Sequence, residues 1–383
     1  MTNKKSNILP IVVMYLLFFM IAFVTNLCNP MAVIVKNNFA MSNFAAQLGN
    51  AANFIAYAAM GIPAGMLLKK IGYRKTALVA ILIGFIGVFL QYMSGWAAIQ
   101  SFWVYLAGAF TAGFCMCMLN TVVNPMLNTL GGGGNKGNQL VQFGGVCNSL
   151  AAVLVTIIMG SLIADATKAQ IADATPALMI ALGVFAFAFL VLLLVKIPEP
   201  AQENEGDKAK DKKYSAFSFR HFNLGILAIF LYMGVEVGVP TYVMQYLTTS
   251  PDATTPGLGI NASIVGMIVA VYWLLMLVGR LLGGMIGGKV SSRAQITGVS
   301  ILCLVLVLLG MFLPTDVMVK MPGIDWATLT IMTAQVPVGV FALILVGLCT
   351  SVMWGGIFNM AVEGLGKYTS IASGAFMTMV CGG

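Results

Sequence analysis

The chain has 383 residues, of which 60% are hydrophobic and only 8% are charged, and its formal net charge is +8. Soluble domains carry about 25% charged residues, so this composition excludes an ordinary soluble protein and indicates one that crosses a membrane repeatedly. The positive charge could suggest a nucleic-acid partner, but the basic residues lie in short loops between apolar stretches, so we expect none.

Ten apolar stretches have roughly the 20 residues that a helix needs to cross a bilayer. They lie at residues 8–35, 44–68, 76–93, 102–130, 139–163, 177–196, 222–247, 262–288, 294–313 and 336–362. The first is too long for a signal sequence and has no small-x-small cleavage site, so we expect it to be retained. The sequence therefore predicts an all-α membrane protein.

The basic residues divide unequally between the two sides of these spans. Sixteen of the 20 lysines and arginines fall on the side of the N-terminus, while only Lys36, Lys168 and Lys320 fall on the other side. Cytoplasmic loops carry such an excess of basic residues. We predict a multi-pass protein of the plasma (inner) membrane with a cytoplasmic N-terminus.

The longest predicted cytoplasmic connection mixes acids and bases between Glu199 and Lys213. A charge-mixed segment of this kind cannot bury a core of its own. We therefore predict a six-helix bundle at residues 1–196, a cytoplasmic linker at 197–221 and a second, incomplete bundle at 222–383. The last apolar run, from Ile371 to Gly383, has only 13 residues, so we expect the chain to end inside an eleventh helix, with a re-entrant terminus as the alternative.

The ends of the second and eighth spans repeat one another. Gly65, Lys70 and Arg74 match Gly284, Lys289 and Arg293 with one constant offset of 219. Such a match indicates two parallel repeats. The glycine allows close helix packing, and the basic pair can hold carbonyls at a neighbouring helix C-terminus. The alternative is that basic loops follow from the charge bias alone. The predicted conformational motif comprises Gly65, Lys69, Lys70, Gly72, Arg74, Lys289 and Arg293.

Several motifs resemble the fucose/galactose/glucose:proton symporter family of the major facilitator superfamily. They are residues 25–29 (TNLCN), 61–73 (GIPAGMLLKKIGY), 119–125 (LNTVVNP), Asn148-Ser149 and 234–238 (GVEVG). The resemblance covers nearly the whole chain. It implies a major facilitator fold of two pseudo-repeated six-helix bundles that imports a sugar by alternating access.

This chain departs from the family pattern at two positions. Typical members carry carboxylates in the helix 1 and helix 4 motifs, where this chain has Asn29 and Asn120. An amide can bind a sugar hydroxyl as donor and acceptor, but it cannot take up a proton near neutral pH. Helix 5 also departs, with Gly144-Gly145 before the Asn-Ser pair.

Polar residues at helical spacing predict a binding cavity, since such residues inside membrane helices usually face a pathway. Amides would bind hydroxyl groups and aromatic rings would pack on the sugar ring. The alternative is that the amides join helices, at about 1 kcal/mol each. The predicted substrate-binding residues are Asn26, Asn29, Asn53, Tyr57, Asn120, Asn124, Gln142, Asn148, Tyr232, Glu236, Tyr272 and Trp273. The aromatic residues Tyr272, Trp273 and Trp354 could equally be packing residues.

Glu236 is a lone acid in the middle of a span, which is costly unless it is protonated, paired or hydrated. If it faces the cavity it could carry a proton or, with amide oxygens, bind Na⁺. Alternatively, a neighbouring amide or Arg280 holds it. Arg280 itself, near the cytoplasmic end of its helix, is expected to be structural.

We therefore predict a secondary transporter that imports a neutral sugar (a hexose, deoxyhexose or related saccharide) by alternating access, with H⁺ or Na⁺ symported through Glu236. An uncoupled facilitator and a transporter of another small polar solute remain alternatives. An enzyme is not expected, because His221 and one buried acid supply no catalytic pair. The seven cysteines lie in apolar spans without metal-ligand spacing, so no metal or cofactor is expected. The partners expected are the sugar, the cation and the lipid bilayer, with the protein as a monomer.

Overall fold

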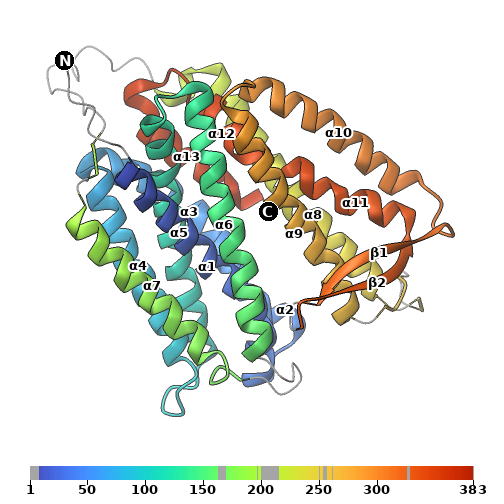
Figure 1. Ribbon diagram of the computed structural model, residues 1–383. Coiled ribbons are helices and arrows are strands. Elements are labelled where there is room, and N and C mark those ends of the chain that lie inside the picture. Colours follow the sequence, from blue (N-terminus) through green and yellow to red (C-terminus); the bar gives the residue numbers. More distant parts are fainter. Residues whose placement is uncertain are drawn as a thin grey trace, which may run out of the picture.

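The computed structural model describes residues 8–162, 170–195, 197–199, 215–249, 251–252, 257–260, 262–325 and 328–382. The N-terminal bundle consists of α1 to α7 and the C-terminal bundle of α8 to α13, and the two stand side by side (Figure 1). Within the described ranges, ten spans are long and apolar enough to cross a membrane, as predicted.

The N-terminal bundle is built from six long helices and one short helix. They are α1 (Ile8–Asn38), α2 (Asn43–Ala46), α3 (Leu48–Ile71), α4 (Tyr73–Met93), α5 (Phe102–Leu130), α6 (Gly134–Leu162) and α7 (Thr175–Leu194). Proline lies inside α1, α3 and α5 without ending them, which transmembrane helices tolerate because neighbouring groups satisfy the freed backbone.

The C-terminal bundle is more irregular. Its elements are η2 (Ala216–Ser218), α8 (Arg220–Thr248), α9 (Ala262–Gly287), α10 (Ser292–Phe312), β1 (Met318–Asp325), β2 (Thr330–Pro337), α11 (Val338–Thr350), α12 (Met353–Val362), η3 (Gly366–Tyr368), α13 (Thr369–Thr378) and η4 (Met379–Gly382). The predicted linker 197–221 falls largely outside the described residues.

The repeat expected from the basic motifs extends to whole helices. The bounds of α4 and α10 differ by the same offset of 219 that relates the motifs. In the N-terminal bundle, α7 packs against α4. A groove of about 1080 Å³ lies between α10 and α8, and α12, which contacts α10, also lines it. Its lining is mostly apolar, and His221, Arg293 and Glu363 lie along it.

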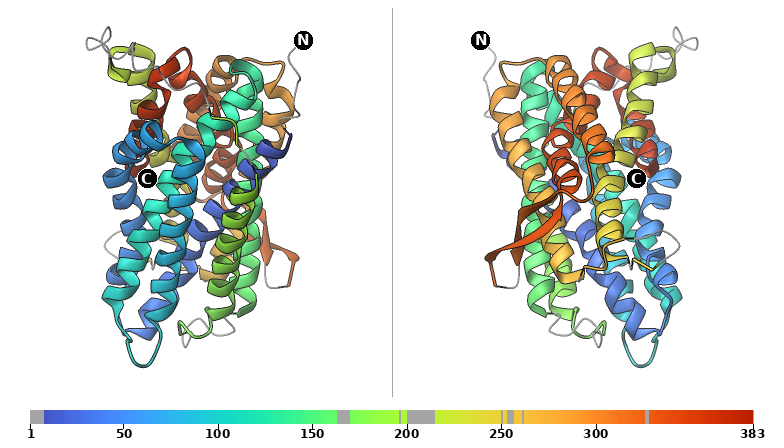
Figure 2. Two further views of the ribbon diagram at one scale, coloured as in Figure 1. Left: turned by 90° about the vertical axis from the view of Figure 1, so that its left-hand side faces the viewer. Right: turned by 90° about the vertical axis from the view of Figure 1, so that its right-hand side faces the viewer.

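An antiparallel hairpin interrupts the helical fold between α10 and α11, and an all-α reading of the sequence did not predict it. Met318 pairs with Pro337 and Asp325 with Thr330. The hairpin packs on α9, where Met321 is buried and a Cβ added at Gly323 would lie 3.1 Å from the Met267 Cβ. It projects sideways from the C-terminal bundle (Figures 1 and 2).

The tenth span is two helices, whereas the sequence predicted one helix at 336–362. Helix α11 ends at Thr350 and α12 begins at Met353. At the break, the Ser351 hydroxyl donates to the Leu348 carbonyl at 2.5 Å, and the Val352 carbonyl accepts a bond from Gln142 in the other bundle. Local side-chain bonds of this type compete with the helical ladder, which accounts for the break.

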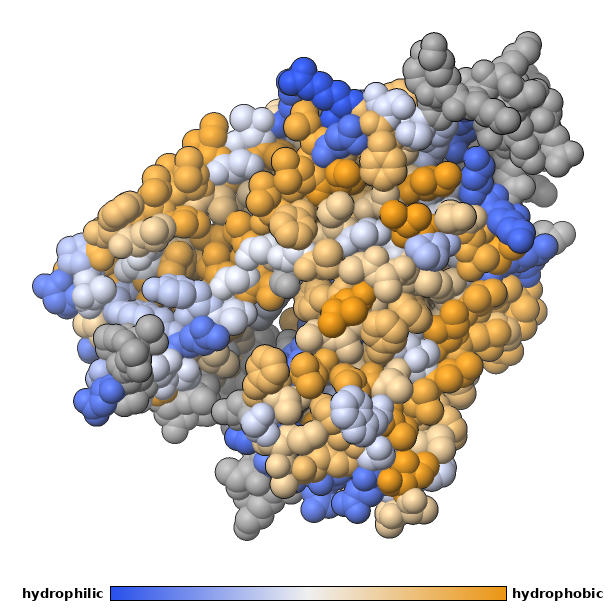
Figure 3. All heavy atoms as spheres, turned by 180° about the vertical axis from the view of Figure 1, so that it is seen from behind, coloured by the Kyte–Doolittle hydropathy of each residue, from blue (hydrophilic) through white to orange (hydrophobic). Residues whose placement is uncertain are grey.

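The two bundles pack together near one end of the molecule, which we call the basic end because the loops carrying Lys69, Lys70, Arg74, Lys289 and Arg293 gather there. Close contacts pair α3 with α13 and α6 with α9. Away from the basic end, the surface is hollowed between the bundles (Figure 3). The outer faces of the helices are broadly apolar, as a lipid-facing surface requires.

Candidate functional site

A chain of hydrogen bonds links α3, α5 and α12 through predicted binding residues. The Asn120 Nδ2 donates to the Tyr57 hydroxyl at 2.8 Å, and the Asn124 Nδ2 donates to the Asn120 carbonyl at 2.9 Å. From the other bundle, Trp354 Nε1 donates to Asn124 Oδ1 at 3.2 Å. Both asparagines are buried, so each amide must find its partners within the protein or on a bound solute.

Asn53 lies at the contact of α3 with α1. Its Nδ2 lies 2.9 Å from the Cys28 sulfur and 3.2 Å from the Gly49 carbonyl. Asn26 donates to the Ala22 carbonyl of its own helix. Asn29 belongs to α1, but its side chain lies outside the described part of the structure. Asn53 therefore joins two helices, which is the alternative reading of the amides given above.

Gln142 crosses from α6 to the break in the tenth span. Its Nε2 donates to the Val352 carbonyl at 2.8 Å. A Cβ placed on Gly355 would lie 3.1 Å from that same nitrogen, so α12 approaches α6 closely here. The predicted residue Gln142 thus binds backbone of the opposite bundle.

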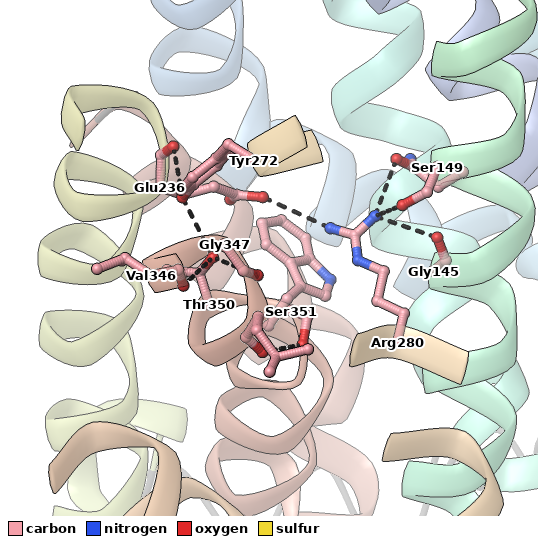
Figure 4. A network of polar contacts seen from close by, with 12 residues as sticks. Gly145, Ser149, Glu236, Tyr272, Arg280, Val346, Gly347, Thr350 and Ser351 are labelled. Carbon is pink, nitrogen blue, oxygen red and sulfur yellow. Dashed lines mark hydrogen bonds and ion pairs between the residues drawn. The ribbon is translucent and has the colours of Figure 1, made fainter. Parts of the chain in front are cut away.

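The guanidinium of Arg280, on α9, connects α8 with α6 of the other bundle (Figure 4). Its Nη2 lies 3.5 Å from the Glu236 Oε1, and its Nη1 lies 2.8 Å from the Ser149 Oγ. The same Nη1 also lies 3.1 Å from the Gly145 carbonyl and 3.4 Å from the Asn148 Oδ1. Of the readings considered for Glu236, the structure shows pairing with Arg280.

Gly145 explains why the polar residues of the family pattern are missing from this part of α6. A Cβ at Gly145 would lie only 3.1 Å from the Arg280 Cδ. A bulkier residue would displace the long side chain that crosses the helix there. The glycine therefore makes room for Arg280.

Tyr272 and Tyr232 flank Glu236, but in different ways. The Tyr272 hydroxyl donates to the Glu236 carbonyl at 3.1 Å and lies 3.2 Å from the Thr350 hydroxyl, which fixes α9 to α8 and α11. Tyr232 lies one turn before Glu236 and is 4% exposed. Its hydroxyl lies close enough to interact with the Glu236 carboxylate, but in the described part of the chain it makes no hydrogen bond of standard geometry. A buried hydroxyl of this kind is a ready contact for a solute or a water molecule.

Trp273 is not brought together with the amide chain. It is 39% exposed, and its ring packs edge-on against Tyr272 at 5.2 Å. Trp354, which sequence reasoning treated as a packing residue, stands beside Asn124 and packs on Tyr232 at 6.4 Å between ring centroids. Trp354 lies just after a helix break that the sequence did not predict, so no helical periodicity identified it as a site residue.

Gly65 and Arg74, two residues of the predicted conformational motif, pack against neighbouring helices at the basic end. A Cβ at Gly65 would lie 2.7 Å from the Ser370 carbonyl oxygen, so the glycine lets α3 approach α13. Arg74 donates to the Leu192 and Leu193 carbonyls at the end of α7, at 2.9 and 2.6 Å. Gly72, with φ of +84°, makes the turn between α3 and α4. Lys69, Lys70, Lys289 and Arg293 are exposed.

Glu199, a residue of the predicted linker, also takes part in these contacts. Its carboxylate accepts bonds from the Tyr73 and Arg74 backbone nitrogens at 2.7 and 3.0 Å. An acid at a helix N-terminus is favoured by the helix dipole. In the described ranges, no group of three or more His, Cys, Asp or Glu side chains could hold a metal ion.

Two helical bundles that meet around buried polar side chains at mid-depth define a multi-pass membrane transporter. Residues 14–383 match the family model described as Major Facilitator Superfamily, and the chain belongs to that superfamily. Its members are transporters and not enzymes, as the sequence predicted.

Curated relatives agree with the family resemblance seen in the motifs. The chain is 26% identical over 388 residues to a glucose/galactose transporter of Brucella abortus (biovar 1, strain 9-941), covering 100% of this chain and 87% of the relative. It is 29% identical over 390 residues to a putative glucose/galactose transporter of Helicobacter pylori (strain J99), covering 100% and 88%. It is 23% identical over 410 residues to the L-fucose-proton symporter of Escherichia coli K12, covering 100% and 86%.

Solved structures show the same fold. The transporter FucP in the outward conformation superposes with a TM-score of 0.80 at 20% identity, covering 99% of this chain and 90% of that chain. The proton:xylose symporter XylE, bound to 6-bromo-6-deoxy-D-glucose, superposes with a TM-score of 0.67 at 13% identity, covering 97% and 85%.

Proposed function

We propose that this protein imports a neutral, hydroxyl-rich sugar by alternating access, with a cation carried on Glu236. The observation that carries the proposal is the hydrogen-bonded chain Tyr57–Asn120–Asn124–Trp354, which spans both bundles at their contact. Amides donate and accept hydrogen bonds without carrying charge, so they suit hydroxyl groups better than ionic groups. An indole offers an apolar face with a polar edge, which suits a sugar ring.

The amides bond to one another and to helix backbone. A sugar would have to replace these bonds with its own hydroxyl groups, so binding exchanges hydrogen bonds instead of filling empty positions. A buried polar group left unpaired costs about 1 to 3 kcal/mol. Solutes with fewer hydroxyl groups would therefore bind more weakly, which gives the site a means of selection.

The named relatives support the choice of solute class. Two of them are named as glucose/galactose transporters and one as an L-fucose-proton symporter. A hexose or deoxyhexose is therefore our first choice of substrate. Asn29 and Asn120 remain proposed sugar ligands, with Asn53, Gln142 and Asn148 at the edges of the same region.

The same proposal assigns the orientation of the protein in the membrane and the movement of its two bundles. The basic end faces the cytoplasm, because basic loops are retained on that side. The two bundles move as bodies about the polar region, and the contacts of α3 with α13 and α6 with α9 close the cytoplasmic side. In this arrangement the hollow away from the basic end admits sugar from outside.

Counterflow in proteoliposomes tests the proposal directly. Vesicles loaded with unlabelled sugar are diluted into labelled sugar, and transient accumulation reports exchange by the protein. A panel of D-glucose, D-galactose, L-fucose, D-xylose, glycerol and a hexuronate separates neutral hexoses from other solutes. We expect counterflow with at least one hexose. Exchange of the hexuronate or glycerol alone would contradict the proposal.

Coupling is tested in the same vesicles by imposing an inward proton gradient or an inward Na⁺ gradient. Accumulation driven by one gradient identifies the cation. Equilibration with counterflow, but without accumulation under either gradient, would identify an uncoupled facilitator, the alternative within the same class.

A further inference from the structure

Arg280 is the part of the site that neither the sequence motifs nor the proposed sugar contacts use. It lies on α9, in the C-terminal bundle, yet its Nη1 contacts three oxygens of α6 in the N-terminal bundle. These acceptors are a backbone carbonyl, an amide oxygen and a hydroxyl. All three are neutral, so they accept hydrogen bonds from Nη1 but do not balance the positive charge of the guanidinium.

The carboxylate of Glu236 supplies the negative charge that the three acceptors on α6 lack. Its Oε1 lies 3.5 Å from Nη2, on the side of the guanidinium that faces α8 (Figure 4). Both side chains are 11% exposed. A buried ion pair is destabilised strongly when one partner loses its charge, because the other is left as an uncompensated ion. The burial of Arg280 between the bundles therefore depends on an ionised Glu236.

We propose that Arg280 is a charge latch, a positioning residue that ties closure of the basic end to the charge of Glu236. With Glu236 ionised, Arg280 is buried against α6 and the bundles stay packed. When a bound cation or proton neutralises Glu236, the buried guanidinium loses its counter-ion. Separation of α6 from α9 then becomes favourable, because it exposes Arg280 to water.

The position of Arg280 on α9 makes this exposure feasible. It precedes the last residue of the helix, Gly287, by seven residues, roughly 10 Å along the axis at 1.5 Å per residue. The side chain can extend towards the basic end once α6 moves away. The inference rests on the proposed function in one respect, since it makes cation binding the trigger for opening towards the cytoplasm.

Closure can be measured without any sugar. A Cβ built on Gly287 would lie 3.6 Å from the Gln139 Cβ, within the range that a disulfide requires. The paired substitution Gln139→Cys/Gly287→Cys therefore reports contact of α6 with α9 through its rate of oxidative cross-linking. Mass spectrometry of the linked peptides, in full-length protein in proteoliposomes, distinguishes this disulfide from any made by native cysteines.

In this reporter, we expect Glu236→Gln to slow cross-linking at least about tenfold, the change that corresponds to about 1.4 kcal/mol. Adding Arg280→Gln removes the guanidinium that E236Q leaves without a counter-ion. The double variant E236Q/R280Q is therefore expected to cross-link at the rate of R280Q alone. Leu281→Met, on the exposed side of the same turn, is the matched control and should leave the rate unchanged. Size-exclusion chromatography checks that each variant is folded.

Two results would overturn the latch. The first is that E236Q cross-links at the same rate as the parent reporter. The second is that E236Q slows cross-linking by the same factor in the parent protein and in the R280Q background. If E236Q alone is poorly folded, the comparison of E236Q/R280Q with R280Q still tests the latch, because both proteins lack the guanidinium. Sugar counterflow is a separate measurement. Loss of counterflow with the charge pattern intact would overturn the sugar proposal and leave the latch standing.

Discussion

Trp354 donates its indole N–H to the Asn124 amide oxygen across the two bundles, at 3.2 Å. This bond joins the helix that follows the break in the tenth span to the helix that carries the amide chain. Because both partners are also proposed to contact the sugar, solute binding and bundle contact compete for the same atoms. Substitutions at these positions should therefore change affinity and transport rate together.

The first prediction concerns the indole. Trp354→Phe keeps an aromatic ring but removes the donor, and the loss of one hydrogen bond of about 1 kcal/mol should raise the half-saturating sugar concentration about fivefold. Trp354→Ala also removes the ring and should cost much more. Sugar counterflow measures both. Trp103→Phe, at an exposed position of α5, is the control. Equal small effects of the two Trp354 variants would rule out stacking of the ring on the sugar.

The second prediction concerns coupling. Glu236→Gln preserves the shape of the side chain but cannot ionise, so accumulation driven by a cation gradient should be lost while counterflow persists. Glu236→Asp retains the acid and should retain part of the gradient-driven accumulation. Uptake of labelled sugar with and without the gradient measures both. Full accumulation by E236Q would remove Glu236 from the coupling mechanism.

The third prediction concerns the approach of α3 to α13. Gly65→Ala places a methyl group 2.7 Å from the Ser370 carbonyl oxygen and 3.1 Å from the Gly374 Cα, and backbone cannot move aside as a side chain can. Overpacking of this kind costs about 1 to 3 kcal/mol, so initial uptake should fall about tenfold or more.

Gly183→Ala is the control for Gly65→Ala, because nothing lies within 4 Å of a Cβ at Gly183. Its uptake should match that of the parent protein. Uptake by G65A equal to that of G183A would show that the close contact of α3 with α13 is not needed for transport.

The fourth prediction concerns stability at the basic end. Arg74→Ala removes the bonds to the Leu192 and Leu193 carbonyls and should lower the free energy of unfolding by about 1 to 3 kcal/mol. Arg74→Lys should restore part of it, since lysine keeps the charge but not the planar pair of donors. Thermal unfolding in detergent measures the change. Lys75→Ala, at the exposed next position, should have no effect, and a similar loss there would point to general charge at this end.

Much of the fold could be predicted from the sequence because membrane spans are set by length and apolar composition. The offset of 219 also predicted the repeat, and it holds for α4 and α10 over their whole length. The hairpin β1–β2 was missed because it lies outside the spans, where no membrane constrains the chain. The break at Ser351 was missed because no proline marks it and because serine and threonine are also common inside membrane helices.

The candidate site was predicted only in part, for a related reason. Helical spacing identified Tyr57, Asn120 and Asn124, because residues that share one helix face are readable from one stretch of sequence. Arg280 was taken as structural because it lies near the cytoplasmic end of its helix, and its partners on α6 lie more than 130 residues away in the chain. No local pattern connects Arg280 with Gly145 and Ser149, so only the packing of the two bundles reveals their contact.

The bond from Gln142 to the Val352 carbonyl has a consequence for how this transporter can diverge. The acceptor is a main-chain atom, which is present whatever residue occupies position 352. The Val352 carbonyl also accepts a helical bond from the Gly356 nitrogen at 3.3 Å, so what must persist is the local geometry that leaves its second lone pair open to Gln142. Because the Val352 side chain is buried against Gly283, homologues could exchange it for another of similar size and still keep the inter-bundle bond. A search for co-varying residue pairs would overlook it, whereas Gln142→Ala should weaken it in every such homologue.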